Sequence, residues 1–187
     1  MRSVAIITAR WGSTRLPGKM LADLGGKPLL QHIVDRARLS RVDDVWVSTT
    51  TSSKPIIKYC ENNDIPHSIS LDEDDILGRL YATARCAEAD IVVRLWGDAP
   101  LISEYHINAA LLIFGGNGTG YLAASWNEGV VAVMEMDNLT AAHHSITNKE
   151  DRHWIHKYMS QPLTVDTQED LDRVREIVKR SARPAMG

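Results

Sequence analysis

The stretch "SVAIITARWGSTRLPGKM" (Ser3–Met20) joins an apolar run to a loop bent by glycine and proline. The run Ser3–Thr8 is short and rich in β-branched residues, which is typical of a buried strand. The loop carries Arg10, Arg15 and Lys19, although the chain has a formal net charge of -3. A glycine-rich turn between a strand and a helix points backbone N–H groups into one concavity, which binds anions and phosphate above all. We therefore expect a local anion site directly after the first strand.

The rest of the first half alternates predicted strands and helices, which indicates a mainly parallel sheet with helices on both faces. Strands are predicted at 3–8, 43–50, 67–71 and 90–98, and helices at 27–39, 54–63 and 72–89. Beyond residue 98 the pattern is looser, with predicted helices at 103–114 and 149–159, strands at 121–125 and 129–136, and a closing strand, turn and helix over 163–180. Because no repeat or linker interrupts the chain, we predict one domain over residues 1–187, a three-layer α/β/α structure.

The composition is that of an ordinary globular protein, with 44% hydrophobic and 24% charged residues. The small negative net charge gives no global attraction to nucleic acid or to an anionic membrane. No run approaches the roughly 18 apolar residues of a membrane span, and no signal-peptide pattern precedes the first strand, so we expect a cytoplasmic protein. Cys60 and Cys86 are interpreted as two buried thiols in a reducing compartment, with a disulfide left open.

Neither common phosphate-binding motif fits the loop. The P-loop needs four residues between its glycines and a Ser or Thr after its lysine. Here five residues separate Gly12 from Gly18, and Met20 follows Lys19. The G-x-G-x-x-G fingerprint is absent as well. The position of the loop still favours a site over a solvated surface loop, because open α/β sheets bind ligands at the carboxyl ends of their strands.

The segment "ARWGSTRLPGK", followed by "GKPLL" at 26–30, resembles the start of the sugar-activating cytidylyltransferases. That family includes the acylneuraminate and 3-deoxy-manno-octulosonate cytidylyltransferases and a spore-coat polysaccharide branch, to which the chain is most similar. The resemblance resumes at "DDILGRLYATA", "DIVVRLWGDAPLIS" and "LTVDTQEDLDRV", and it is weakest between residues 117 and 162. It implies a nucleotide-diphospho-sugar transferase (Rossmann-like) fold.

The same resemblance implies a reaction in which CMP passes from CTP to a sugar, most simply a sugar acid. The products are a CMP-sugar and pyrophosphate, for surface polysaccharide or glycan synthesis. The implied partners are CTP and the sugar, and a homodimer stays open. A glycosyltransferase of the same fold and a non-catalytic nucleotide-binding protein are the two alternatives.

Specific residues match the motifs of the family. The implied catalytic residues are Arg10, Lys19 and Asp98. The implied metal ligands are Asp98 and Asp166, which match the aspartates of G-D-x-P and V-D-T and would hold Mg²⁺ against a triphosphate. The implied nucleotide-binding residues are Ala9, Arg10, Gly12, Ser13, Lys19, Arg79 and Trp96. Taken alone, Asp98 could be a turn or cap aspartate, and Arg79 an exposed helical arginine.

Two segments depart from the family pattern. Trp96 stands where relatives often carry Gln or Thr beside the nucleotide, and its indole could stack on a base or pack into the core. The segment 128–136, "EGVVAVMEM", is apolar where relatives tend to place an acid in a strand lining the sugar site. The acidic run Asp72–Asp75 is interpreted as a solvated helix start rather than as a metal site. The sequence therefore supports a nucleotide site better than it supports a sugar site.

Overall fold

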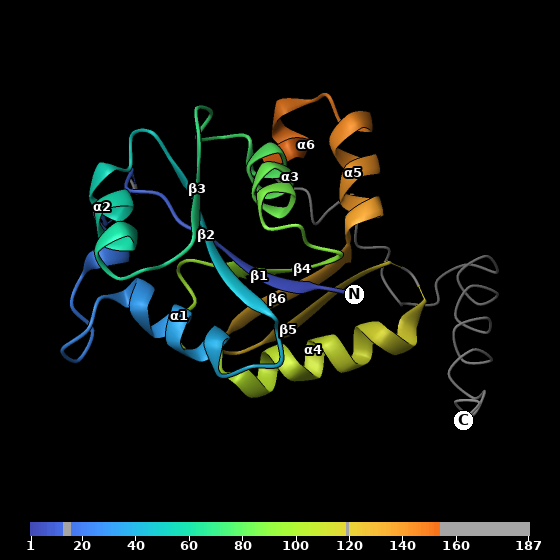
Figure 1. Cartoon of the computed structure of the whole chain (residues 1–187), viewed down its shortest axis with the longest axis horizontal. Coiled ribbons are helices and arrows are strands. Elements are labelled where there is room, and N and C mark those ends of the chain that lie inside the picture. The colour runs from blue at the N-terminus through green and yellow to red at the C-terminus, as the bar shows by residue number, and fades with distance from the viewer. Residues whose placement is uncertain (13–15, 119, 154–187) are drawn as a thin grey trace.

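The computed structural model describes residues 1–12, 16–118 and 120–153 (Figure 1). The elements follow the predicted alternation along these residues. The strands are β1 (Ser3–Thr8), β2 (Asp44–Thr50), β3 (His67–Ser70), β4 (Ile91–Trp96), β5 (Tyr121–Trp126) and β6 (Gly129–Glu135). The helices are the 3-10 turn η1 (Lys19–Leu21) and α1 (Leu29–Arg38), α2 (Lys54–Asn62), α3 (Ile76–Cys86), α4 (Glu104–Asn117), α5 (Met136–Ser145) and α6 (Lys149–His153).

The six strands form one sheet in the order β3-β2-β1-β4-β6-β5. Strands β1 to β4 run parallel, whereas β6 is antiparallel to both β4 and β5. The prediction of a mixed α/β fold with a mainly parallel sheet is therefore confirmed. The chain turns to one side of β1 for β2 and to the other side for β4, so the strand order reverses between β1 and β4. Open α/β sheets bind ligands at the carboxyl ends of the strands at such a reversal.

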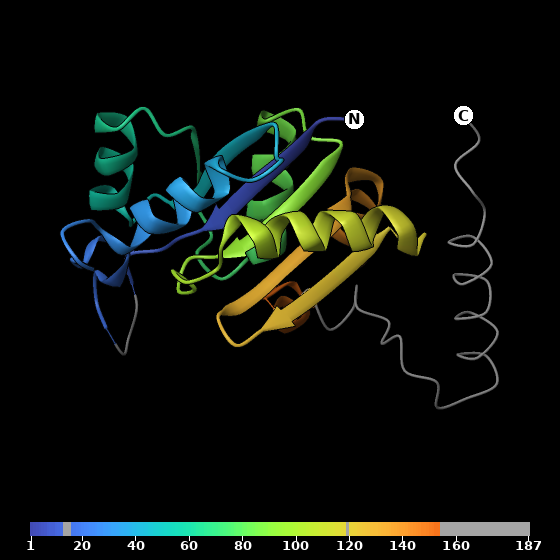
Figure 2. The ribbon, with the colours of Figure 1, turned by 90° about the horizontal axis from the view of Figure 1, so that it is seen from below.

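Helices cover both faces of the sheet, and each face has its own apolar core (Figure 2). One core contains Ile7 and Val93 and is closed by α1, α2 and α4. The other contains Ile6 and Val92 and is closed by α3 and α5. Because strand side chains alternate between faces, the even-numbered residues of β4 point toward the α3–α5 layer. Arg94 lies among them.

Local chemistry moves some helix boundaries away from the predicted ones. Helix α3 begins at Ile76 rather than at 72, because the Asp75 side chain caps it by accepting the Gly78 N–H at 2.8 Å. Helix α4 continues past the predicted end and stops at Gly118, which adopts the left-handed φ of 62° that ends many helices. Helix α5 was not predicted.

The cysteine prediction is half right. Both thiols are free, but Cys60 is buried and Cys86 is exposed at the end of α3, so the expectation of a second buried thiol is wrong. Among the residues that the structure describes, no helix is long and apolar enough to cross a membrane. The remainder of the predicted helix 149–159 and the predicted elements over 163–180 lie outside the described residues.

Candidate functional site

The ends of β1 and β4 meet closely at a glycine. The Gly97 N–H donates to the Thr8 carbonyl at 3.2 Å, and a Cβ atom at Gly97 would lie only 2.5 Å from that oxygen. Any larger residue would force the two strand ends apart. Glycine therefore lets the chain turn here and places Asp98 beside the start of the loop that follows β1.

The predicted anion loop returns to the same edge. Gly18 adopts a left-handed φ of 71° against the Trp11 ring, so a Cβ atom there would lie 2.8 Å from the indole. The Trp11 N–H donates to Ser53 Oγ at 2.9 Å, which ties the loop to the turn between β2 and α2. Lys19 follows, and its Nζ donates to Asp98 Oδ2 at 3.0 Å. The structure thus brings together the predicted residues Lys19 and Asp98.

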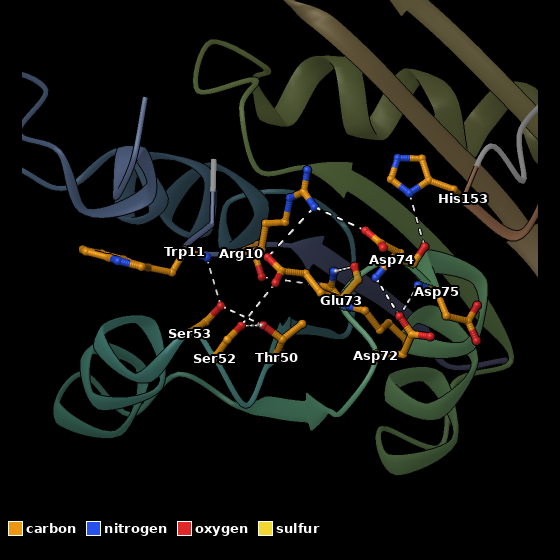
Figure 3. A network of polar contacts seen from close by, with 12 residues as sticks. Arg10, Trp11, Thr50, Ser52, Ser53, Asp72, Glu73, Asp74, Asp75 and His153 are labelled. Carbon is orange, nitrogen blue, oxygen red and sulfur yellow. Dashed lines mark hydrogen bonds and ion pairs between the residues drawn. The ribbon is translucent and has the colours of Figure 1, made fainter. Parts of the chain in front are cut away.

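Arg10 points toward the segment that precedes α3 (Figure 3). Its guanidinium lies 3.9 Å from a Glu73 carboxylate oxygen and 3.8 Å from one of Asp74. The Glu73 carboxylate also accepts a hydrogen bond from Ser52 at 3.3 Å, and Lys149 lies 3.5 Å from Asp74. The acids before α3 therefore do more than solvate a helix start, since two of them hold a cation of the anion loop.

Sequence reasoning missed this role of Glu73 and Asp74. One sequence feature could have pointed to it: the loop carries three cations and no acid in a chain of net negative charge. Such a loop needs anionic partners from elsewhere in the chain when no ligand is bound. The nearby Asp75 has a different task, because it caps α3 and forms an ion pair with Arg152 at 2.8 Å.

Arg79 is buried, with 3% of its surface exposed, so its interpretation as an exposed helical arginine is wrong. Its Nη2 donates to the carbonyl oxygens of Ala9 at 3.1 Å and Ser48 at 2.8 Å. It thereby fixes the backbone at the ends of β1 and β2, directly below the anion loop. Burial, with a smaller contribution from nearby Arg10, lowers the pKa of Arg79 to about 10.

Trp96 is half-buried and contacts both apolar cores. The guanidinium carbon of Arg94 lies 4.0 Å from the centre of its ring, in cation–π geometry. Trp96 is therefore neither a fully buried core residue nor an exposed platform, because Arg94 occupies one face of the indole. The strand pattern around Arg94 does not reveal that this side chain is buried.

The assignment of Mg²⁺ to Asp98 and Asp166 stays a prediction. Asp98 has the exposure that a ligand needs, with 53% of its side chain accessible. No group of three or more His, Cys, Asp or Glu side chains suited to a metal occurs within residues 1–12, 16–118 and 120–153. Asp166 and Ser13 lie outside those residues. The described part of the chain thus supplies one exposed carboxylate, Asp98, with the ammonium group of Lys19 beside it.

Comparison with known sequences places the site in context. The cytidylyltransferase family profile matches residues 4–180 of the chain. The 3-deoxy-manno-octulosonate cytidylyltransferase of Trichlorobacter lovleyi is 42% identical over 125 residues, covering 63% of this chain and 46% of that protein. The Escherichia coli enzyme of the same name is 36% identical over 113 residues, covering 59% and 45%. The chain spans about half the length of the curated relatives it matches.

Comparison with solved structures supports the fold. A cytidylyltransferase from Leptospira borgpetersenii superposes with a TM-score of 0.77 at 21% identity, covering 100% of both chains. A CMP:2-keto-3-deoxy-manno-octonic acid synthetase, solved in complex with CTP, superposes with a TM-score of 0.67 at 20% identity, covering 96% of this chain and 99% of the other. These likenesses agree with the nucleotide-diphospho-sugar transferase type of fold predicted from the sequence.

Proposed function

The chain belongs to the cytidylyltransferase family, and we propose that it transfers CMP from CTP to a hydroxyl of a sugar acid, giving a CMP-sugar and pyrophosphate. The observation that carries this proposal is the contact between Lys19 and Asp98 at the reversal point of the sheet. It joins the anion loop to the strand end where family members carry a metal-binding aspartate. The CMP-sugar would serve surface polysaccharide synthesis, and CTP supply fits a cytoplasmic location.

The reaction forms one bond and breaks one. The sugar hydroxyl oxygen attacks the α-phosphorus of CTP in line, and the bond from that phosphorus to the pyrophosphate oxygen breaks. The hydroxyl proton is lost to solvent. Little covalent chemistry falls to the protein, so its task is to position the two substrates and to stabilise the developing charge.

Each loop residue has a role that follows from its place. Lys19 and Arg10 would bind the β- and γ-phosphates and then the departing pyrophosphate, since charge-assisted hydrogen bonds are the strongest available there. Arg10 exchanges its contacts with Glu73 and Asp74 for phosphate oxygens. Arg79 acts through the backbone of Ala9, which it holds in place. Gly12 lies against Glu73, where a Cβ atom would come within 2.9 Å of the carboxylate, so the loop lies close to the acids that hold Arg10.

The family implies Mg²⁺, and the chain offers Asp98, with Asp166 as the second carboxylate. Mg²⁺ prefers one or two carboxylates together with phosphate oxygens and water, so this donor set fits it. When bound, the ion would neutralise the phosphates and favour attack at the α-phosphorus. Asp98 would hold the metal, and Lys19, which contacts Asp98 in the structure, would bind phosphate.

A pyrophosphate-release screen tests the proposal. The full chain is incubated with each of CTP, UTP, ATP and GTP against a panel of sugar acids and neutral sugars, with Mg²⁺. We expect release with CTP and a sugar acid. Sugar transfer to an acceptor without pyrophosphate release would identify a glycosyltransferase, and CTP binding without turnover across the panel would identify a nucleotide-binding protein.

A further inference from the structure

One buried cation near the site has no role in the proposed reaction. Arg94 lies on β4 with 3% of its surface exposed, and its Nε has no hydrogen-bond partner. Within the described residues it forms no ion pair or hydrogen bond; its guanidinium carbon lies 4.0 Å from the centre of the Trp96 ring, and Tyr121 and Asp98 interact with it only electrostatically. Burial lowers the pKa of Arg94 to about 10, so the group is still charged at neutral pH.

An unpaired buried charge is unfavourable, because it gives up its hydration without gaining an anion. The cation–π contact with Trp96 offsets only part of that cost. Proteins keep such groups mainly where function needs them. The guanidinium lies over Trp96, which places it toward the carboxyl end of β4, the end from which Asp98 emerges.

The sheet surface beside Arg94 is built from small residues. Ala132 on β6 is its direct neighbour across the strands, and Ala123 on β5 is the next residue in the same row. Ala123 is exposed, and so is Ser125, which lies on the same face one step nearer the site. Ala132 is buried, so the open part of this uncharged surface is formed by Ala123 and Ser125. It lies on the β5–β6 side of Asp98, away from the anion loop, which follows β1.

We propose that Arg94 binds the carboxylate of the sugar acid, which would rest on the Ala123–Ser125 surface with its reacting hydroxyl toward Asp98. This inference rests on the proposed function and adds a specificity-determining residue to it. A carboxylate suits the site because it carries one negative charge and can accept two parallel hydrogen bonds from one guanidinium.

The triphosphate is the less suitable anion. Trp11 and Met20, which flank the anion loop, pack with the core closed by α1, α2 and α4. Arg94 faces the opposite layer, closed by α3 and α5. The phosphates would already have Arg10, Lys19 and the loop amides, whereas the buried guanidinium of Arg94 has no anion within hydrogen-bond distance among the described residues.

Calorimetry on the full chain tests the assignment with pairs of ligands that differ by one charge. The ligands are 3-deoxy-manno-octulosonate and an acylneuraminate, each compared with its neutral methyl ester, in the presence of a non-hydrolysable CTP analogue and Mg²⁺.

We expect the wild-type protein to bind at least one acid about 10- to 100-fold more tightly than its ester, which is the range of one charge-assisted hydrogen bond. Arg94→Gln should abolish that preference and leave the affinity for the CTP analogue unchanged. The matched control is Arg85→Gln, an exposed arginine on α3, which should keep the preference.

Stability separates this role from a structural one. If Arg94 serves a ligand, Arg94→Met removes an uncompensated buried charge, and the melting temperature of the ligand-free protein should stay the same or rise. A fall in melting temperature for both Arg94→Met and Arg94→Gln, with the acid preference retained by either, overturns the inference. So does equal affinity of the wild-type protein for acid and ester, or binding of neither acid.

The outcome is distinguishable from failure of the proposed function. Acid preference that depends on Arg94, without pyrophosphate release, would contradict the proposed reaction and keep the carboxylate site. Pyrophosphate release with a sugar acid whose affinity does not depend on Arg94 would support the proposed reaction and contradict the carboxylate site at Arg94.

Discussion

The ammonium group of Lys19 lies 3.0 Å from a carboxylate oxygen of Asp98, although the two residues are 79 positions apart in the chain. The contact joins the anion loop to the residue that follows β4. Both partners are partly solvent-exposed, with 23% and 53% of their side chains accessible. A pair of this exposure contributes little to folding, so the effects of altering it should fall on ligand binding.

Lys19→Ala should weaken binding of CTP far more than binding of CMP. The lost charge-assisted hydrogen bond is worth about 1.5–3 kcal/mol, and it would contact only the outer phosphates. Calorimetry with both nucleotides measures the difference, with Lys58→Ala, an exposed lysine on α2, as the control. Equal small losses for the two nucleotides would remove Lys19 from a phosphate site.

Asp98→Asn should abolish the Mg²⁺-dependent part of CTP binding while leaving the melting temperature in metal-free buffer nearly unchanged. The amide keeps the shape of the side chain but removes the charge that a hard cation needs. A titration of CTP with and without Mg²⁺, alongside a thermal melt, gives both quantities. If Asp98 were a structural turn residue, the mutant would melt lower and bind CTP with Mg²⁺ as before.

Glu73→Gln should strengthen CTP binding by about two- to fivefold at low salt. Glu73 competes with phosphate for Arg10 and adds negative charge close to where the triphosphate would lie. The gain should shrink as salt is raised, because the competing ion pair is partly exposed, with 42% of the Arg10 and 33% of the Glu73 side chain accessible, and is therefore partly screened. Affinities measured at two ionic strengths check this, and a weaker affinity in the variant would mean that Glu73 orients Arg10 productively.

Strand β1 could be predicted from the sequence, whereas the contact between Glu73 and Arg10 could not. Strand β1 was predicted with its observed bounds because a short β-branched run followed by a Gly/Pro turn is a local pattern. The contact of Glu73 with Arg10 joins residues far apart in sequence, so no local pattern contains it. Helix α5 was missed for another reason: its buried set is the single residue Leu139, which leaves almost no helical periodicity to detect.

The candidate site divides in the same way. The loop, Lys19 and Asp98 were predicted because the motifs that carry them are contiguous. Arg79 was placed on the correct helix, but its burial depends on the carbonyl groups of Ala9 and Ser48, which only the folded sheet brings beneath it. Arg94 was left without a role because the burial of a strand arginine is set by the helices packed over it.

Asp75 should make stability fall at low pH. Burial alone would raise the pKa of Asp75, but its hydrogen bonds from Arg152 and from the Gly78 N–H outweigh burial and lower it below the usual value. A carboxyl whose pKa is lower in the folded state stabilises the protein above its unfolded-state pKa, near 3.9, and loses that contribution as pH falls through the folded-state value.

Asp75→Asn should therefore lower the urea midpoint at pH 6, and its difference from the wild-type protein should narrow steadily below about pH 4. Glu61→Gln, at an exposed position on α2, serves as the control. A constant difference between Asp75→Asn and the wild-type protein from pH 6 to pH 2.5 would contradict the assignment.

Trp96→Gln should sharpen the preference for CTP over UTP. Arg94 covers one face of the indole, so the other face is the one that a base could stack on. Stacking is worth about 1–3 kcal/mol and tolerates any base, because every base has a π-face. A Gln side chain offers a donor and an acceptor instead, which can distinguish the amino group of cytosine from the carbonyl of uracil. CTP and UTP affinities of the two proteins give the ratio, and Trp126→Gln on β5 is the matched control.

Trp96 also contacts both cores, so the urea midpoint should fall moderately in the variant. A large fall in midpoint with an unchanged CTP/UTP ratio would make Trp96 a packing residue and remove it from the nucleotide site.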